Sequence, residues 1–157
     1  MNVCTFWPLD AAQRALLTES QLAASDAQRI TLSLRFSGVL DVGRFCDALR
    51  WLMLKHPLLR ASVRHHDGHP TYAIQESVDL PAKVWSAHDS ADYPDDAWLY
   101  GDFVLDAAPL WRCGISHDTI DACEVVIVMH HLIADGASLL LMQRELEQAY
   151  LGVRAFW

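Results

Sequence analysis

Two adjacent histidines precede an Asp-Gly pair at the end of an apolar run. The stretch His130–Gly136 reads HHLIADG and follows the apolar segment Val125–Met129. An imidazole accepts a proton near neutral pH, and the free amides at the start of a helix can stabilise an oxyanion. The pattern therefore indicates a candidate acid–base site between a strand and a helix.

Strand geometry limits what the two histidines can do together. Successive side chains of a strand point to opposite faces, so at most one of His130 and His131 faces a given cleft. A metal site made of His130, His131 and Asp135 is disfavoured because the two rings diverge and no further ligand follows at metal spacing. From the residues alone, a structural alternative stays open and is favoured for an arbitrary His-His pair: two partly buried histidines, with Asp135 as a helix cap.

A second group of histidines surrounds the pair Asp67-Gly68. His65, His66 and His69 could be interpreted as metal ligands. However, Asp-Gly favours the positive backbone angles of a tight hairpin turn, so a solvated hairpin tip is the better interpretation. We predict no bound metal at either histidine group.

Composition excludes several classes of protein. The chain has 157 residues, of which 52% are hydrophobic, with a net charge of −8, so we expect one soluble domain that does not bind nucleic acid. No apolar run approaches the roughly 20 residues of a membrane helix, and residues 1–8 lack a secretory signal, so we expect no membrane partner and a cytoplasmic location. The four cysteines are expected to be reduced thiols; Cys113 and Cys123 could alternatively face each other across a hairpin.

The elements that must position HHLIADG follow from periodicity. Residues 121–130 are nearly all apolar and predict a strand in the middle of a sheet, and the spacing of Leu139, Met142 and Leu146 predicts a helix resting on it. Asp41 is expected to cap another helix that stops at Pro57. The remaining predicted elements are a helix over 10–23, strands over 29–38 and near Val84, a hairpin around 67–68, a helical turn over 97–103 and a strand over 108–117. The order is that of a layered α+β fold.

At this point four segments resemble one known family. HHLIADG resembles the His-His-x-x-x-Asp-Gly motif of condensation domains in nonribosomal peptide synthetases and related acyltransferases. PLDAAQRALL (8–17) looks like the opening segment of that family, with Asp10 where serine is usual, and KHPLLRASV (55–63) is similar to its Arg-His-x-x-Leu-Arg segment. FVLDAAPLWRCGI (103–115) resembles the stretch before the histidine strand. The four segments occur in the family's order.

The resemblance implies a chloramphenicol-acetyltransferase-like two-layer lobe, with a mostly antiparallel sheet and helices packed on one face. It implies that residues 1–157 form a single lobe like the N-terminal, donor-side subdomain of a condensation domain, with the C-terminal lobe absent. In the family, two lobes enclose a tunnel into which carrier proteins insert phosphopantetheine arms. The expected partners are thus a peptidyl or acyl carrier protein and the missing lobe, or a second copy through self-association. No permanently bound cofactor is expected; a phosphopantetheine arm or CoA carries the substrate.

The resemblance also implies residue roles. His131 is matched to the catalytic histidine, and His130 to a packing or loop-orienting residue. Asp135 is expected to pair with Arg60 in a buried ion pair that holds the loop, so that its loss would damage folding. Gly136 is expected to let a backbone amide approach the substrate, and Ser138 to open the helix.

The implied function is acyl transfer from a carrier-bound or CoA-bound thioester to an amine or hydroxyl, forming an amide or ester. Two alternatives stay open. The chain could assemble with itself into a chloramphenicol-acetyltransferase-like enzyme, or it could be a non-catalytic docking lobe that binds a carrier protein or partner chain.

Overall fold

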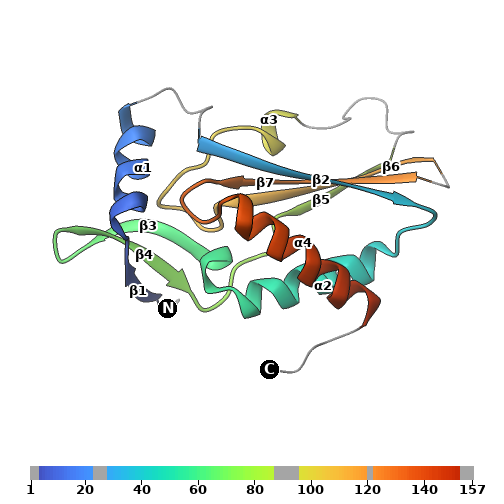
Figure 1. Cartoon of the computed structure of the whole chain (residues 1–157), viewed down its shortest axis with the longest axis horizontal. Coiled ribbons are helices and arrows are strands. Elements are labelled where there is room, and N and C mark those ends of the chain that lie inside the picture. Colours follow the sequence, from blue (N-terminus) through green and yellow to red (C-terminus); the bar gives the residue numbers. More distant parts are fainter. Residues whose placement is uncertain (1–3, 23–27, 87–95, 120–121, 153–157) are drawn as a thin grey trace.

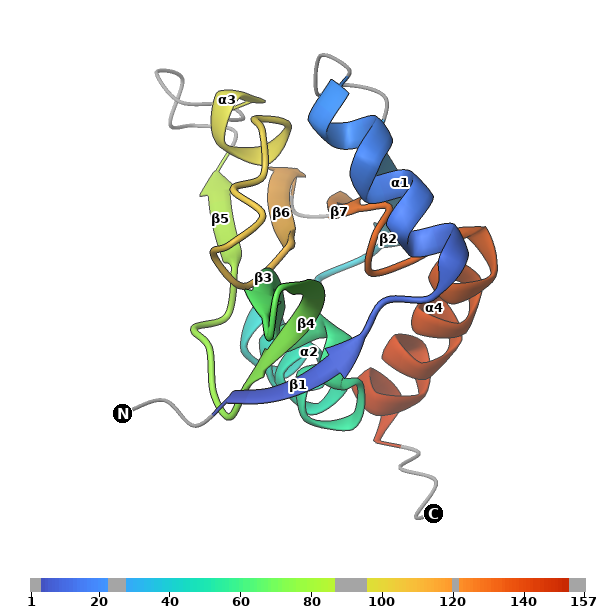
Figure 2. The same ribbon diagram turned by 90° about the vertical axis from the view of Figure 1, so that its left-hand side faces the viewer.

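The computed structural model describes residues 4–22, 28–86, 96–119 and 122–152 (Figure 1). The two longest helices, α2 and α4, lie together along one face of a four-stranded sheet (Figures 1 and 2). The elements in chain order are β1 (Cys4–Pro8), α1 (Ala11–Leu22), β2 (Arg29–Ser37), α2 (Val42–Lys55), the 3-10 helix η2 (Pro57–Arg60), β3 (Ala61–His66), β4 (His69–Gln75), β5 (Ala82–Ser86), α3 (Asp96–Leu99), β6 (Trp111–Thr119), β7 (Ala122–His130) and α4 (Gly136–Leu151).

The strands form two sheets rather than one. The larger sheet has the order β2-β7-β6-β5, with β5 parallel to β6 and the other pairs antiparallel. The smaller sheet, β1-β4-β3, is antiparallel throughout. The predicted α+β class and the interior place of β7 are confirmed. Helices α2 and α4 cover one face of the larger sheet, and the single turn of α3 contacts β6.

Local signals in the sequence explain the element boundaries. The Asp41 carboxylate caps α2 by accepting a hydrogen bond of 3.0 Å from the Arg44 amide, as predicted. Asp67 and Gly68 both have positive φ angles, 52° and 78°, and form the tip of the β3–β4 hairpin. The predicted hairpin tip at the second histidine group is therefore confirmed.

The core lies between the large sheet and the two long helices. Phe45 and Leu49 of α2, Ile127 of β7 and Leu146 of α4 are almost fully buried. Burial of each such side chain stabilises the fold by about 1.5–3 kcal/mol. The core thereby holds the end of β7 and the start of α4 in a fixed relation.

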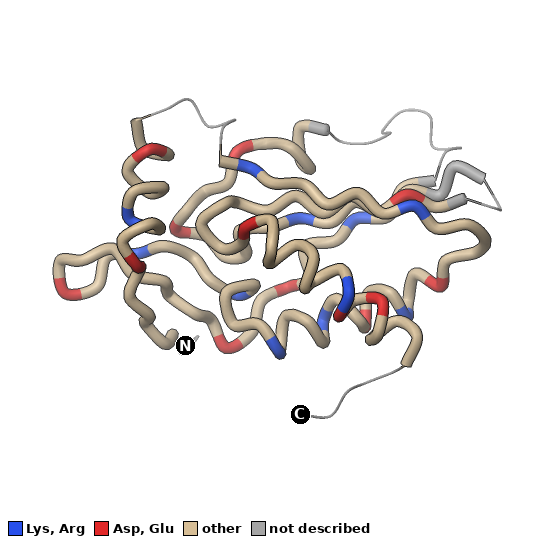
Figure 3. Tube along the Cα trace, in the orientation of Figure 1, with Lys and Arg blue, Asp and Glu red and all other residues tan. Residues whose placement is uncertain are grey.

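The described cysteines are all free thiols. The predicted alternative of Cys113 facing Cys123 is wrong, because the β6–β7 register places Cys113 opposite Ile127 and Cys123 opposite His117. Among the described helices, none is both long and apolar enough to cross a membrane. Lys and Arg are dispersed among Asp and Glu along the described trace, without a basic stripe (Figure 3).

Candidate active site around His131

The loop from His131 to Asp135 connects the buried end of β7 to the start of α4. Its backbone is held from several directions. The His131 amide donates to the Gln28 carbonyl over 2.7 Å, and the Ile133 amide donates to the His130 carbonyl over 3.1 Å. The hydroxyl of buried Tyr72 in β4 donates to the Leu132 carbonyl. Residues from both sheets thus fix the path of the loop.

The His130 ring is buried and makes a hydrogen bond and an aromatic contact within the fold. The side chain is 7% exposed, and its Nδ1 accepts a hydrogen bond of 3.1 Å from the Leu132 amide. Phe103 packs edge-on against the ring, with the centroids 6.1 Å apart. Burial, together with the nearby charge of His131, lowers the pKa of His130 to about 4. A neutral ring that accepts at Nδ1 carries its proton on Nε2, and the bond from the Leu132 amide links the ring to the loop. The loop-orienting role implied for His130 stays a prediction.

The His131 ring is in the opposite situation. It is half-buried, and the described part of the chain provides no hydrogen-bond partner for its side chain. Its backbone, in contrast, is fixed through Gln28. A positioned imidazole with both nitrogens uncommitted can accept a proton from a bound molecule.

The predicted ion pair between Asp135 and Arg60 is wrong. The Asp135 carboxylate is exposed and accepts from the amide and hydroxyl of Ser138, over 2.7 and 2.6 Å. These hydrogen bonds to Ser138 lower the pKa of Asp135. The Arg60 guanidinium instead donates to three backbone carbonyls, those of Met53, Gln75 and Glu76. Asp135 is therefore a cap of α4, and Arg60 binds backbone carbonyls of α2 and of the end of β4.

The Asp135 cap also occupies a backbone amide at the start of α4. Ser138 lies in the first turn of α4, as predicted, but its amide is already bound by the Asp135 carboxylate. One amide that could have stabilised an oxyanion is thus occupied. Gly136 begins α4, is exposed, and has open space where a Cβ would stand. Its approach to a substrate stays a prediction.

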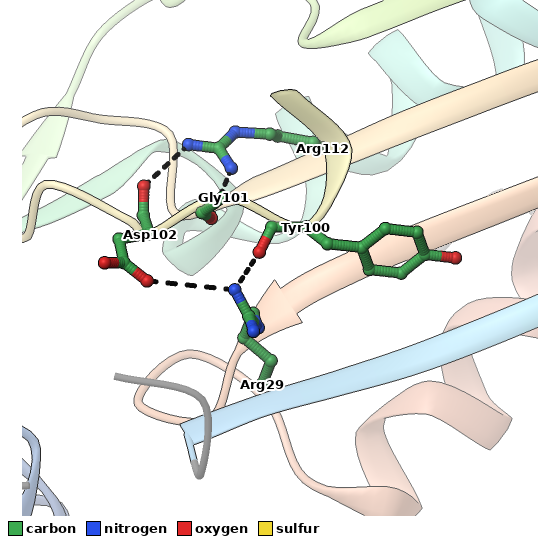
Figure 4. A network of polar contacts seen from close by, with 5 residues as sticks. All are labelled: Arg29, Tyr100, Gly101, Asp102 and Arg112. Carbon is green, nitrogen blue, oxygen red and sulfur yellow. Dashed lines mark hydrogen bonds and ion pairs between the residues drawn. The ribbon is translucent and has the colours of Figure 1, made fainter. Parts of the chain in front are cut away.

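A network of polar contacts made by Arg29 and Arg112 with residues 100–102 lies near the site and was not foreseen from the sequence (Figure 4). Arg29 donates to the Tyr100 carbonyl and lies 3.8 Å from the Asp102 carboxylate. Arg112 donates to the Gly101 and Asp102 carbonyls over 2.6 and 3.0 Å. Two arginines thus tie residues 100–102 to the starts of β2 and β6.

The same network reaches His130 through an aromatic ring. The Arg112 guanidinium lies 4.4 Å from the centroid of the Phe103 ring, which packs against His130. Phe103 and Arg112 both fall in the segment 103–115 whose resemblance was noted, so a signal for them existed. No signal in the sequence linked Arg29 to this segment, because 71 residues separate it from Tyr100.

The described residues contain no group of three His, Cys, Asp or Glu side chains arranged to hold a metal ion. In the hairpin, the His66 ring stacks on Phe6, with the centroids 3.9 Å apart. This stacking explains one histidine of the second group as a packing residue.

Comparison with known proteins identifies the fold and the family. The structure is similar to the starter condensation domain of rhizomide synthetase RzmA, with a TM-score of 0.81 and 22% identity, over 95% of this chain and 38% of that one. It is also similar to AB3403, a four-domain nonribosomal peptide synthetase, with a TM-score of 0.80 and 19% identity, over 100% of this chain and 13% of that one. The fold is therefore that of condensation domains.

Sequence comparison agrees with this assignment. Bacitracin synthase 3 of Bacillus licheniformis is 31% identical over 149 residues, which are 94% of this chain and 2% of the synthase. Polyketide synthase PksN of Bacillus subtilis is 32% identical over 148 residues, 91% of this chain and 3% of that protein. The condensation domain family model matches residues 3–155. The chain belongs to the condensation domain family, and it spans only a small fraction of these synthetases.

Proposed function

We propose that this chain is the histidine-bearing lobe of a condensation-type acyltransferase. It transfers an acyl group from a thioester to an amine or hydroxyl, with His131 as the residue that handles the proton. The observation that carries the proposal is the half-buried His131 ring, to which the described residues offer no hydrogen-bond partner, on a loop whose backbone is fixed by hydrogen bonds.

The reaction follows from this placement. An imidazole nitrogen of His131 accepts the proton of the attacking amine or hydroxyl while the nucleophile bonds to the thioester carbonyl carbon. The tetrahedral oxyanion then collapses, the carbon–sulfur bond breaks, and the leaving thiolate receives the proton. A hydroxyl needs the base during attack, whereas an alkylammonium must lose a proton before it. His131 is therefore more important for ester than for amide formation.

The acyl donor is a thioester of a carrier-protein phosphopantetheine arm or of CoA, and the protein needs no resident cofactor for this chemistry. Two neighbours support this choice: one RzmA starter domain is in complex with C8-CoA, and AB3403 is a multidomain nonribosomal peptide synthetase. The partner is accordingly a peptidyl or acyl carrier protein. A second lobe, or a second copy of the chain, supplies the other wall of the site.

The test measures acyl transfer by mass spectrometry, with an acyl-CoA or acyl-carrier thioester as donor and an amine or alcohol as acceptor. Light scattering of the same sample reports the native mass. His131→Ala should lower the transfer rate by about 100-fold or more, with the larger loss for the alcohol. His65→Ala, at the exposed hairpin tip, is the matched control and should leave the rate unchanged.

Two results would contradict the proposal. His131→Ala could transfer acyl groups as fast as the unmodified chain. Alternatively, the unmodified chain, assembled with a second lobe or a second copy, could bind a carrier protein without transferring any acyl group, which would identify a docking lobe.

A further inference from the structure

An apolar cavity of about 260 Å³ lies beside the HHLIADG loop. Its walls come from β1, η2, the end of β7 and the first half of α4. The apolar side chains that line the cavity include Trp7, Leu58, Met129, Ile133, Leu141 and Met142. Met129, Ile133 and Met142 are buried, so the deep part of the cavity is hydrocarbon.

The two most polar side chains on the wall already have partners. His56 contacts the Glu145 carboxylate through Nε2, and the Ser138 hydroxyl donates to Asp135 over 2.6 Å. Neither brings a free charge to the interior. A charged or strongly polar ligand would lose its hydration without compensation, whereas the transfer of an aliphatic chain from water into the cavity is favourable. The cavity therefore selects for hydrocarbon.

The cavity lies close to His131 along the chain. Met129 and Ile133 flank the two histidines on either side in sequence, and both line the cavity. Ile133 and Ala134 belong to the loop that carries His131, and Ser138 lies in the first turn of α4; all three line the cavity. The cavity therefore adjoins the loop on which His131 stands.

We propose that this cavity binds the aliphatic chain of the acyl donor, so that the substrate is a medium-chain fatty acyl thioester rather than a charged aminoacyl thioester. The inference rests on the proposed function and names its substrate class. A cavity of roughly 150 Å³ holds one six-carbon ring, so this cavity accommodates a chain of about six to ten carbons. Each methylene buried contributes about 0.8 kcal/mol, which corresponds to about a fourfold decrease in Kd.

The methionines provide a direct test. Met129 and Met142 line the cavity, whereas Met53 is buried in α2 and does not. The experiment follows the ¹³C-methyl methionine signals by NMR during titration with N-acetylcysteamine thioesters of acetate, hexanoate and octanoate. Octanoyl thioester should shift the Met129 and Met142 signals but not that of Met53. From hexanoyl to octanoyl, the Kd should fall about 16-fold, that is, fourfold for each of two methylenes.

Two variants of α4 give a matched pair. Leu141 is 48% exposed at the rim of the cavity, and its neighbour Leu140 is 69% exposed and does not line it. Leu141→Trp should narrow the opening and raise the Kd for octanoyl thioester at least tenfold, while Leu140→Trp should not change it. Circular dichroism verifies that both variants fold, and the chain-length series on the unmodified protein decides the question if one does not.

The outcomes separate this inference from the proposed function. Octanoyl thioester that leaves Met129 and Met142 unshifted, or a Kd independent of chain length, overturns the inference even if acyl transfer occurs. His131→Ala should retain octanoyl binding, because the ring is outside the cavity wall. Binding with this signature, but without transfer by the unmodified chain once it is assembled with a second lobe or a second copy, would leave the cavity assignment standing and overturn the proposed function instead.

Discussion

At the scale of single residues, the surroundings decide the difference between His130 and His131. Burial against Phe103 and the bond from the Leu132 amide commit the His130 ring to the loop. The next ring has no such partner in the described chain and remains available for chemistry. Two identical side chains, one peptide bond apart, thus have different surroundings, and the strand ends between them.

The low pKa of His130 predicts how folding stability depends on pH. Its folded pKa of about 4 lies below the ordinary value of 6.5, so the unfolded chain binds the proton more readily between these values. Stability contributed by the neutral ring is complete above pH 6.5 and is lost as the pH falls toward 4. His130→Asn keeps an acceptor for the Leu132 amide but does not titrate.

The measurement is urea unfolding of both proteins at pH 7 and pH 4. The unmodified chain should lose more stability than His130→Asn over this range, by on the order of 2 kcal/mol once residual solvent screening is considered. Equal losses in the two proteins would show that His130 titrates alike in the folded and unfolded states.

At the scale of elements, Glu145 connects α4 to the end of α2. Its buried carboxylate contacts Lys55 Nζ over 2.8 Å and His56 Nε2. Burial alone would raise the pKa of Glu145, but the hydrogen bonds and charges of these two residues outweigh burial and lower it. The contact fixes α4, and with it one wall of the apolar cavity.

Glu145→Gln should therefore destabilise the fold by about 1–3 kcal/mol, because it removes a charge-assisted pair and leaves Lys55 and His56 without their anion. Urea unfolding at pH 7 measures the loss. Glu147→Gln, on the exposed side of the same helix, is the control and should stay within about 0.5 kcal/mol of the unmodified chain. A similar effect of both substitutions would mean that the pair with α2 contributes nothing specific.

At the scale of the whole molecule, exposed apolar surface and net charge have opposite effects on the association of one copy of the chain with another. Eleven large hydrophobic side chains are exposed among the described residues, and the chain covers 38% of the solved RzmA starter domain. Exposed apolar patches usually mark interaction surfaces. The net charge of −8 acts against association of identical copies.

We therefore expect concentration-dependent self-association that salt strengthens, because salt screens the repulsion between copies. Light scattering at tens of micromolar protein should give about twice the chain mass of 17.7 kDa or more, and the mass should rise between low and high salt. A mass that stays at that of one chain at all protein and salt concentrations would contradict this expectation.

Several features of the fold could be predicted because they depend on neighbouring residues. The alternation of β2, the cap at Asp41 and the hairpin at Asp67-Gly68 reflect local backbone geometry, and all were confirmed. The family was likewise predictable from four short segments, and the family model confirms it. The catalytic role of His131 stays a prediction that the structure makes chemically reasonable.

Contacts between distant segments required the tertiary structure. The expected partner of Asp135 was Arg60, but packing placed Arg60 against carbonyls at the ends of α2 and β4. The division of the strands into two sheets and the contact of Phe103 with His130 also depend on long-range packing.

By itself, the sequence determined the local elements and the chemical groups at the strand–helix junction, because periodicities of 2 and 3.6 residues and the steric limits of each residue act over a few positions. Only the tertiary structure decided which histidine is buried, which partner each charge has and where the cavity lies. These properties depend on contacts between distant residues, such as Lys55 and Glu145, which are 90 positions apart, and such contacts are set by the packing of the whole chain.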